Sequence, residues 1–226
     1  VLFMPKKTLS CSISFAAMHR ATIKFSKLGG SGAFLDLVLE NTSIREEYNI
    51  ELVYEAYRKQ VNKDICLIGG NALDIPFKDC SFEWVVIKNL LHHLVGKTRR
   101  ESKAYARRAV EELIRVTKDG GYIIILEQYN RHRLFSSAIF YLTLFFSVFS
   151  IGFKSFGWGK NVIVSFLTPE EIRNLLMSSG NVKTVLNREN RLNMSRKWKY
   201  TLLMSDIGRL VVIGKVVRES KAHDEA

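Results

Sequence analysis

The sequence predicts an α/β protein with a mostly parallel sheet, helices on both faces of that sheet, and an antiparallel edge. Three observations support this prediction. β-prone runs alternate with amphipathic segments, one apolar run resembles a strand buried on both faces, and two β-prone runs follow each other near the end of the chain. The 226 residues, 47% of them hydrophobic, are enough for one substantial core. We therefore expect a single domain over residues 21–226.

The first half of this domain is predicted to form alternating strands and helices. Ala21–Phe25 is β-prone and is followed by a glycine turn at Gly29–Gly32 and an amphipathic helix. A second unit runs from Glu47 through a helix near Tyr54 to Val61, and Ile65–Gly69 forms a third strand. Residues 1–20, with a lysine pair before a serine-interrupted apolar stretch, partly resemble a signal peptide and stay unassigned.

The second half continues the pattern with clearer boundaries. Phe82–Ile87 is the buried strand, a helix is predicted over Arg100–Val116, and Lys118–Gly121 separates this helix from the strand YIIILE. A capping box at Thr168, with Pro169 in the first turn, opens another helix that extends to about Ser179. The two late β-prone runs are Lys199–Met204 and Arg209–Val217.

The amino-acid composition says more about the cellular compartment of the protein than about its binding partner. Cys11, Cys66 and Cys80 lie far apart without a His/Cys cluster, so neither a disulfide framework nor a metal site is predicted, and a reducing, cytoplasmic location is expected. The net charge of +12 is compatible with nucleic acid, an anionic membrane or an acidic ligand, and does not choose among them.

Polar side chains follow the buried strand directly. Asn89, His92 and His93 come after Ile87, where ligands bind in parallel α/β sheets because the carboxyl ends of the strands meet at one edge. The alternative interpretation is structural: Asn89 caps a helix and the two histidines pack against its first turn.

Three segments in order resemble the class I S-adenosylmethionine-dependent methyltransferases, in particular the small-molecule branch that includes ubiquinone and menaquinone biosynthesis enzymes. The segments are GNALDIPFKDCSFEWVVIKNLLHHL, EELIRVTKDGGYIIILE and LTPEEIRNLLMSSG. This resemblance implies a Rossmann-like, doubly wound sheet of seven strands. It also implies methyl transfer from S-adenosyl-L-methionine to a small acceptor.

The resemblance also implies a set of cofactor contacts. Bare backbone at the glycine turn would let the methionine end of the cofactor approach. Glu51 stands where a carboxylate accepts the ribose hydroxyls, and Glu55 is the alternative for this role. Asn71 takes the place of the acid near the adenine amino group, and Ala72 would pack on the ring. Ser26 and Leu28 stand where the family has an acid and its first glycine. The expected cofactor-binding set is Gly29, Gly30, Gly32, Glu51, Asn71, Ala72, Asn89 and Leu90.

Methyl transfer depends mainly on alignment, because the sulfonium is already activated. A base is needed only for acceptors that lose a proton, and His93 or His92 is the candidate because imidazole titrates near neutrality. Glu127 and Tyr129, at the end of the fifth strand, are expected to line the acceptor side.

The segment Leu134–Phe153 bears on the acceptor. Its twenty residues carry no charge, which meets the length of a membrane span, but a crossing would separate the last helix and strands from the sheet. Ser136, Thr143, Ser147 and Ser150 form one stripe on a helix. We predict that residues 131–160, inserted after the fifth strand, form an apolar lid or interfacial helix.

In this insertion, Phe145 and Phe149 would contact a lipophilic acceptor, and the basic residues at both ends would favour peripheral contact with a membrane. A wholly buried core helix is the alternative for this segment. For the whole protein two alternatives remain. One is an inactive methyltransferase-like binding protein, and the other is a nucleic-acid methyltransferase that uses its basic surface.

Overall fold

A computed structural model describes the chain over residues 71–149, 163–192 and 206–218, together with the backbone of three strands at 24–28, 46–51 and 65–69. Several predicted features lie outside these residues: the N-terminal segment 1–20, the glycine turn Gly29–Gly32, the helix near Tyr54, and the β-prone run Lys199–Met204.

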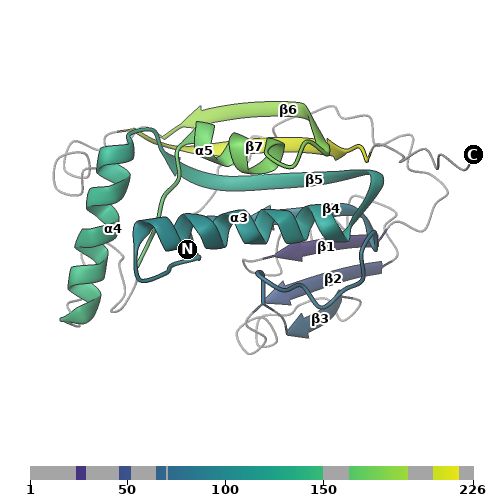
Figure 1. Cartoon of the computed structure of the whole chain (residues 1–226), viewed down its shortest axis with the longest axis horizontal. Helices are drawn as coiled ribbons and strands as arrows, with labels where there is room; N and C mark the ends of the chain where they lie inside the picture. Colours follow the sequence, from purple (N-terminus) through teal and green to yellow (C-terminus); the bar gives the residue numbers. More distant parts are fainter. Residues whose placement is uncertain are drawn as a thin grey trace, which may run out of the picture.

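The described strands form one mixed sheet in the order β3-β2-β1-β4-β5-β7-β6 (Figure 1). Five strands run parallel: β1 (Lys24–Leu28), β2 (Glu46–Glu51), β3 (Ile65–Gly69), β4 (Phe82–Lys88) and β5 (Thr117–Asn130). The α/β class predicted from the alternating pattern is confirmed, and β3 has the predicted bounds.

The far edge of the sheet is antiparallel. β7 (Ile207–Val216) pairs antiparallel with β5, and β6 (Val182–Arg191) pairs antiparallel with β7. β6 was not predicted from the sequence, and its residues VKTVLNRENR are mostly exposed. An edge strand with water on most of its surface lacks the alternation of apolar residues that marks a half-buried strand.

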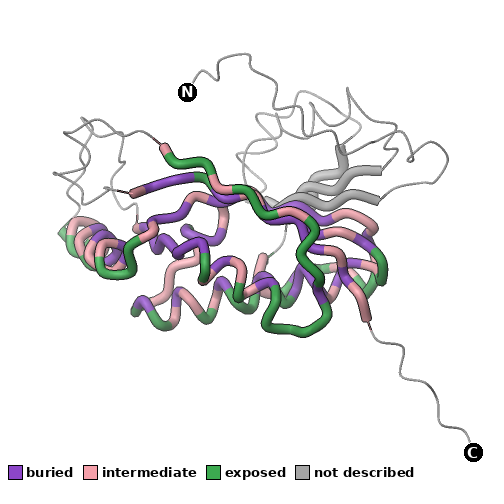
Figure 2. Tube along the Cα trace, turned by 90° about the horizontal axis from the view of Figure 1, so that it is seen from above, coloured by how far each residue is buried: buried purple, intermediate pink, exposed green. Residues whose placement is uncertain are grey.

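The helices α3 (Arg99–Val116) and α5 (Pro169–Met177) cover the same face of the sheet, and their outward side chains are exposed (Figures 1 and 2). α3 ends at Val116 as predicted, and its buried side includes Ala109, Val110 and Leu113. These pack against the buried strand residues of β4 and β5 in one core cluster. Burial of this apolar surface makes the main favourable contribution to the free energy of packing between helix and sheet.

The N-terminus of α5 has the predicted capping box. Thr168 accepts a hydrogen bond from the Glu171 amide, and the Glu171 side chain accepts one from the Thr168 amide. Two backbone donors at the helix start are thereby satisfied, which stabilises α5 by about 1 kcal/mol. The helix ends at Met177, slightly before the predicted end near Ser179.

The helix α4 (Arg133–Val148) follows β5 and lies beyond the edge at which the parallel strands end (Figure 1). It is partly buried, so a wholly buried core helix is the wrong alternative for this part of the chain. Its buried residues are Ser136, Ile139, Phe140 and Thr143, whereas Leu134, Tyr141, Phe145 and Val148 are exposed. Among the described residues, no helix is long and apolar enough to span a membrane.

Candidate active site

The strand order places the reversal point of the sheet between β1 and β4. β2 and β3 lie on one side of β1, whereas β4 and β5 lie on the other. Leu28, the last residue of β1, pairs with Ile50 and Ile87. Glu51 and Gly69 end β2 and β3 in register with each other. In open parallel sheets, ligands bind beside such a reversal point, outside the carboxyl ends of the strands.

The loop of residues 71–81, between β3 and β4, carries two of the predicted cofactor residues. Asn71 is exposed and Ala72 is half-buried at the margin of the core. The Asn71 side-chain oxygen accepts a hydrogen bond from the Leu73 amide at 3.0 Å, and the Asn71 carbonyl accepts one from the Asp74 amide at 3.0 Å. These two bonds form a local turn that fixes the Asn71 side chain at the start of the loop.

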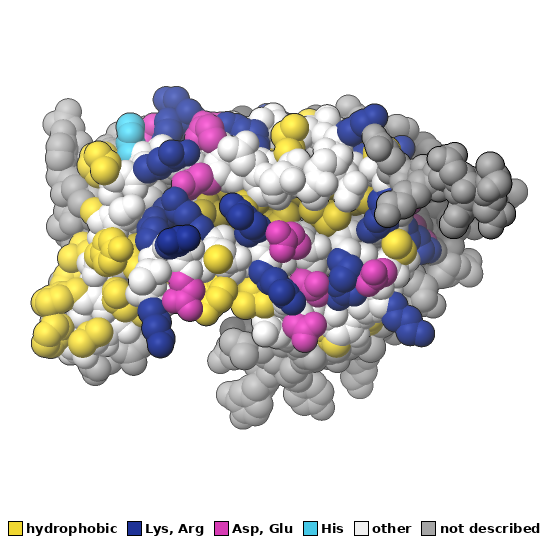
Figure 3. All heavy atoms as spheres, viewed as in Figure 1, with side chains coloured by type: hydrophobic (Ala, Val, Ile, Leu, Met, Phe, Trp, Pro, Cys, Tyr) yellow, Lys and Arg dark blue, Asp and Glu magenta, His cyan; other side chains and the backbone are white. Residues whose placement is uncertain are grey.

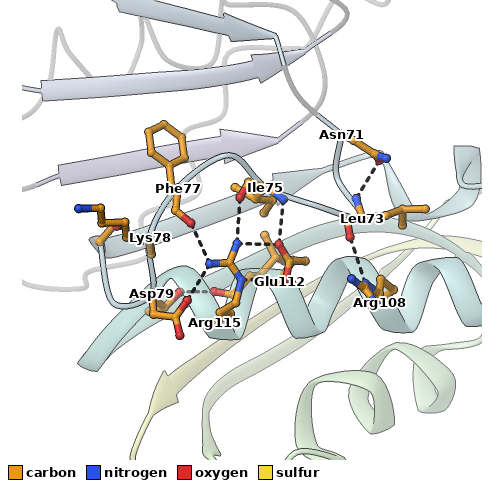
Figure 4. Close-up of polar contacts among 12 residues, drawn as sticks. Asn71, Leu73, Ile75, Phe77, Lys78, Asp79, Arg108, Glu112 and Arg115 are labelled. Atoms are coloured by element: carbon orange, nitrogen blue, oxygen red, sulfur yellow. Dashed lines mark hydrogen bonds and ion pairs between the residues drawn. The ribbon is translucent and has the colours of Figure 1, made fainter.

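The same loop is fastened to α3 by Glu112 and Arg115, and Arg108 donates a further hydrogen bond to the Leu73 carbonyl at 3.1 Å (Figure 4). The Arg115 guanidinium donates to the carbonyls of Ile75 and Phe77 at 2.9 and 2.8 Å, and the Glu112 carboxylate accepts the Ile75 amide at 2.8 Å. Arg115 also pairs with Glu112 at 2.7 Å, which lowers the pKa of the Glu112 carboxyl. The position of Asn71 and Ala72 therefore depends on contacts made by a neighbouring helix.

The turn after β4 is held by its backbone. Asn89 has a left-handed conformation with φ of 51°, and its amide donates to the Leu126 carbonyl at 2.8 Å. Asparagine tolerates this conformation better than most residues do, and its side chain here remains exposed. Leu90 is half-buried against the core, and a short 3-10 helix, η2 (Leu91–His93), follows. Asn89 therefore precedes this helix rather than capping it, because the N-cap position of η2 is Leu90.

Glu127, at the end of β5, is a buried carboxylate that organises this turn. It accepts hydrogen bonds from the Leu91 amide at 2.7 Å and the Gln128 amide at 2.7 Å, and its Oε1 lies 2.5 Å from Nδ1 of His92. His92 is buried as well. A carboxylate oxygen accepts, so Nδ1 of His92 is assigned as the donor in this contact. Glu127 thus fixes the orientation of the His92 ring and of the turn that carries it.

His93 is the exposed member of the histidine pair. Its ring centroid lies 4.1 Å from that of His92. Burial of part of the ring is the main reason why the pKa of His93 is lowered from its ordinary value, and the charge of His92 acts in the same direction. Glu127 opposes this shift without reversing it. The neutral imidazole of His93 therefore persists to lower pH than that of a free histidine.

A second layer of contacts lies behind the histidines and was not identified from the sequence. The Ser165 amide donates to the His92 carbonyl at 2.8 Å, and the ring of Phe166 stacks on that of His92. Arg99 is buried and donates to Ser165 Oγ at 2.9 Å and to the Phe166 carbonyl. No local sequence signal marks this layer, since its members are far apart in the chain.

The structure does not bring all the predicted acceptor residues together. Tyr129 is fully buried in the core, where Gly208 packs closely against its phenol, and Glu127 is enclosed by the contacts described above. Phe145 and Phe149 are exposed on α4, with ring centroids 4.7 Å apart. Among the described residues, no cluster of three or more His, Cys, Asp or Glu side chains is arranged to hold a metal ion.

This strand order and edge define an S-adenosylmethionine-dependent methyltransferase-like fold, and comparison with known proteins supports that class. Residues 28–125 match the methyltransferase domain family. A protein of Encephalitozoon cuniculi that bears a methyltransferase name is 42% identical over 59 residues, which is 26% of this chain and 25% of that protein. Demethylmenaquinone methyltransferase of Bacillus cereus is 27% identical over 124 residues, which is 52% of this chain and 48% of the enzyme.

Solved structures agree with the fold. An S-adenosylmethionine-dependent methyltransferase from Methanosarcina mazei superposes with a TM-score of 0.59 at 14% identity, over 91% of this chain and 98% of that one. The match to the curated relatives spans half or less of their length. Together with the match to the methyltransferase domain family, these comparisons support the class I S-adenosylmethionine-dependent methyltransferase that the sequence blocks indicated.

Proposed function

We propose that the protein transfers a methyl group from S-adenosyl-L-methionine to a small, lipophilic acceptor, within one domain over residues 21–226. The observation that carries this proposal is the reversal of strand order between β1 and β4. The predicted glycine turn follows β1 directly, Glu51 ends β2, and Asn89 follows β4 at the same edge of the sheet. Residues at the ends of three strands would thereby surround a single ligand.

The chemistry of this residue set fits the cofactor. A carboxylate at Glu51 suits the ribose hydroxyls, and an amide at Asn71 suits the adenine amino group through the remaining lone pair of its oxygen. Ala72 and Leu90, which lie half-buried at the core margin, suit the faces of the adenine ring. Gly29, Gly30 and Gly32 would receive the methionine end, where backbone amides at a helix start favour its carboxylate.

The cofactor supplies an activated methyl group. The protein therefore has to position the acceptor and, where the acceptor loses a proton, to accept that proton. In this proposal His93 accepts the proton of an acceptor that loses one, because its ring is exposed at this edge and its pKa is lowered. His92 and Glu127 act as positioning residues, since both are buried and bound to each other. Tyr129 supports the acceptor side from within the core instead of touching the acceptor.

The lipophilic character of the acceptor is inferred from the insertion over 131–160. Its described helix, α4, begins three residues after Asn130, at the edge where the methyl acceptor would enter. A segment this apolar suits a lid over an apolar acceptor. Phe145 and Phe149, at the C-terminal end of α4, would contact that acceptor. A cytoplasmic protein that takes such an acceptor from a bilayer would make peripheral contact with the membrane.

Calorimetry with S-adenosylmethionine and with its demethylated product tests the cofactor half of the proposal. We expect binding of both ligands and an increase in the melting temperature. No heat and no thermal shift with either ligand at millimolar concentration would instead favour an inactive relative that binds a partner. Transfer of labelled methyl groups to a quinone-like phenol, but not to RNA, tests the acceptor half.

A further inference from the structure

The helix α4 departs from the pattern of an ordinary surface helix. Its buried stripe contains Ser136 and Thr143 beside Ile139 and Phe140, and the Ser136 hydroxyl has no hydrogen-bond partner there. Its outward side carries large apolar side chains instead. A surface helix normally buries its apolar face and exposes its polar one, so the orientation of α4 indicates that something apolar covers its outer side.

The outward apolar side chains form one continuous stripe. Leu134 is 84% exposed and Val148 is 71% exposed, and Tyr141, Phe145 and Phe149 are exposed between and beside them. The spacing from Leu134 to Tyr141, Phe145 and Val148 is 7, 4 and 3 residues, which places them on one face of a helix. Of the seven exposed large hydrophobic side chains in the described part of the chain, these account for five. We call this stripe the outer face of α4.

Basic side chains lie next to the outer face on the same side of the molecule (Figure 3). Arg100, Lys103 and Arg107 recur at helical spacing along the first half of α3. Glu171 joins the two helices, because it contacts Lys103 at 2.7 Å and Arg133 of α4 at 3.6 Å. One carboxylate therefore serves two cations, and the surroundings of α4 keep an excess of positive charge. We call Arg100, Lys103 and Arg107 the basic stripe.

We propose that the outer face of α4 and the basic stripe of α3 together dock on an anionic membrane surface. The combination of apolar side chains with a cationic margin is the chemistry of a helix that lies in the interface between head groups and acyl chains. α4 has 16 residues, which is short of the roughly 20 needed to cross a bilayer, so it would lie along the surface.

Charge decides between a membrane and a second copy of the chain. A dimer through the outer face would bring together two copies that each carry a net charge of +12 and a basic stripe beside the contact, so the copies would repel each other. An anionic membrane would instead attract the same positive charge. Nucleic acid would use the basic stripe but leaves the apolar stripe uncovered, because phosphate contacts need cations and not aliphatic side chains.

This inference rests on the proposed function, because docking through α4 would bring the edge of the sheet, where the acceptor would bind, to the lipid. Its test does not need the cofactor. The protein is mixed with vesicles of phosphatidylcholine alone, or of equal amounts of phosphatidylcholine and phosphatidylglycerol, and bound protein is measured by flotation. We expect binding to the anionic vesicles that weakens with salt but keeps a salt-resistant part.

Three sets of variants locate the contact. Phe145→Ser with Phe149→Ser should weaken vesicle binding roughly tenfold or more, because each ring that leaves the interface removes a large apolar area. Val148→Ser should weaken it, whereas the matched change Val185→Ser, at a residue 57% exposed on β6, should not. Arg100→Gln with Arg107→Gln should remove the salt-sensitive part, whereas Arg188→Gln on β6 should leave it.

The outcomes separate the rival explanations. Equal effects of Val148→Ser and Val185→Ser would overturn the proposal, as would tight RNA binding without vesicle binding. A dimer in solution that the Phe145 and Phe149 changes convert to a monomer would assign the outer face to a second copy and also overturn it. Vesicle binding without methyl transfer would leave the docking surface in place and reject the proposed function instead.

Discussion

Replacing Arg115 by Met should destabilise the protein by a measurable and pH-dependent amount. The guanidinium donates to two carbonyls in the loop of residues 71–81 and pairs with Glu112 at 2.7 Å and Asp79 at 2.8 Å. Methionine retains an aliphatic stem of similar length on α3 but offers no donor. The change therefore leaves the loop without its main attachment and the Glu112 carboxylate without its partner.

The expected magnitude follows from the burial of each partner. The Glu112 side chain is only 11% exposed, and hydrogen bonds to such charged groups contribute about 1.5–3 kcal/mol net each. The Asp79 side chain is 73% exposed, so its pair with Arg115 adds about 0–1 kcal/mol. Because Arg115 itself keeps some contact with water, we expect a total loss of about 2–4 kcal/mol in the free energy of unfolding.

Urea denaturation followed by circular dichroism measures this loss, with Arg115→Lys and Asp79→Asn as graded controls. Lysine keeps the charge but not the fork that reaches two carbonyls at once, so its loss should be intermediate, and Asp79→Asn should have the smallest effect. Arg115 lowers the folded-state pKa of Glu112 below the ordinary value of 4.5. Its contribution is therefore complete above that value and is lost as the pH falls through the folded-state pKa.

The difference in stability between the wild-type protein and Arg115→Met should accordingly narrow in acid. Cofactor affinity should also fall in the variant, because Asn71 and Ala72 belong to the loop that Arg115 fastens. A loss no larger than that of Asp79→Asn, or a difference that stays constant as the Glu112 carboxyl becomes protonated, would refute this reasoning.

Three further predictions concern the site and the core. Gly32→Val should abolish cofactor binding with little change in the circular dichroism spectrum, and normal binding would show that the glycine turn is misassigned. His93→Asn should remove the acidic limb of the rate profile for an acceptor that loses a proton, and in the wild type that limb should lie below the ordinary imidazole pKa of 6.5. Gly208→Ala should destabilise the fold by about 1–3 kcal/mol, because the new methyl group would meet the Tyr129 phenol and the Asn190 carbonyl oxygen, the latter at 2.7 Å. An unchanged melting temperature would contradict this last prediction.

Elements with local signals could be predicted from the amino-acid sequence alone. The capping box at Thr168 marked the start of α5, and the helical periodicity that ends at Val116 marked α3 almost to the residue. The continuous apolar run of β4 indicated a strand buried on both faces, and the polar residues after it indicated the edge where ligands bind. Such signals are short in range because hydrogen bonds and side-chain spacing within one element set them.

Contacts between residues far apart in the chain could not be predicted from the sequence, because they form only when the whole domain packs. β6 is a strand because β7 pairs with it, although its own residues are mostly exposed. Glu127 orients the turn after β4 because its carboxylate contacts the Leu91 amide and His92, which lie 35 positions or more away in the sequence, and no local pattern predicts such contacts. The stripe of Ser136 and Thr143 was visible in the sequence, but its inward direction was not. A helical pattern fixes which side chains share a face, whereas only the packing of the rest of the chain fixes which face meets water.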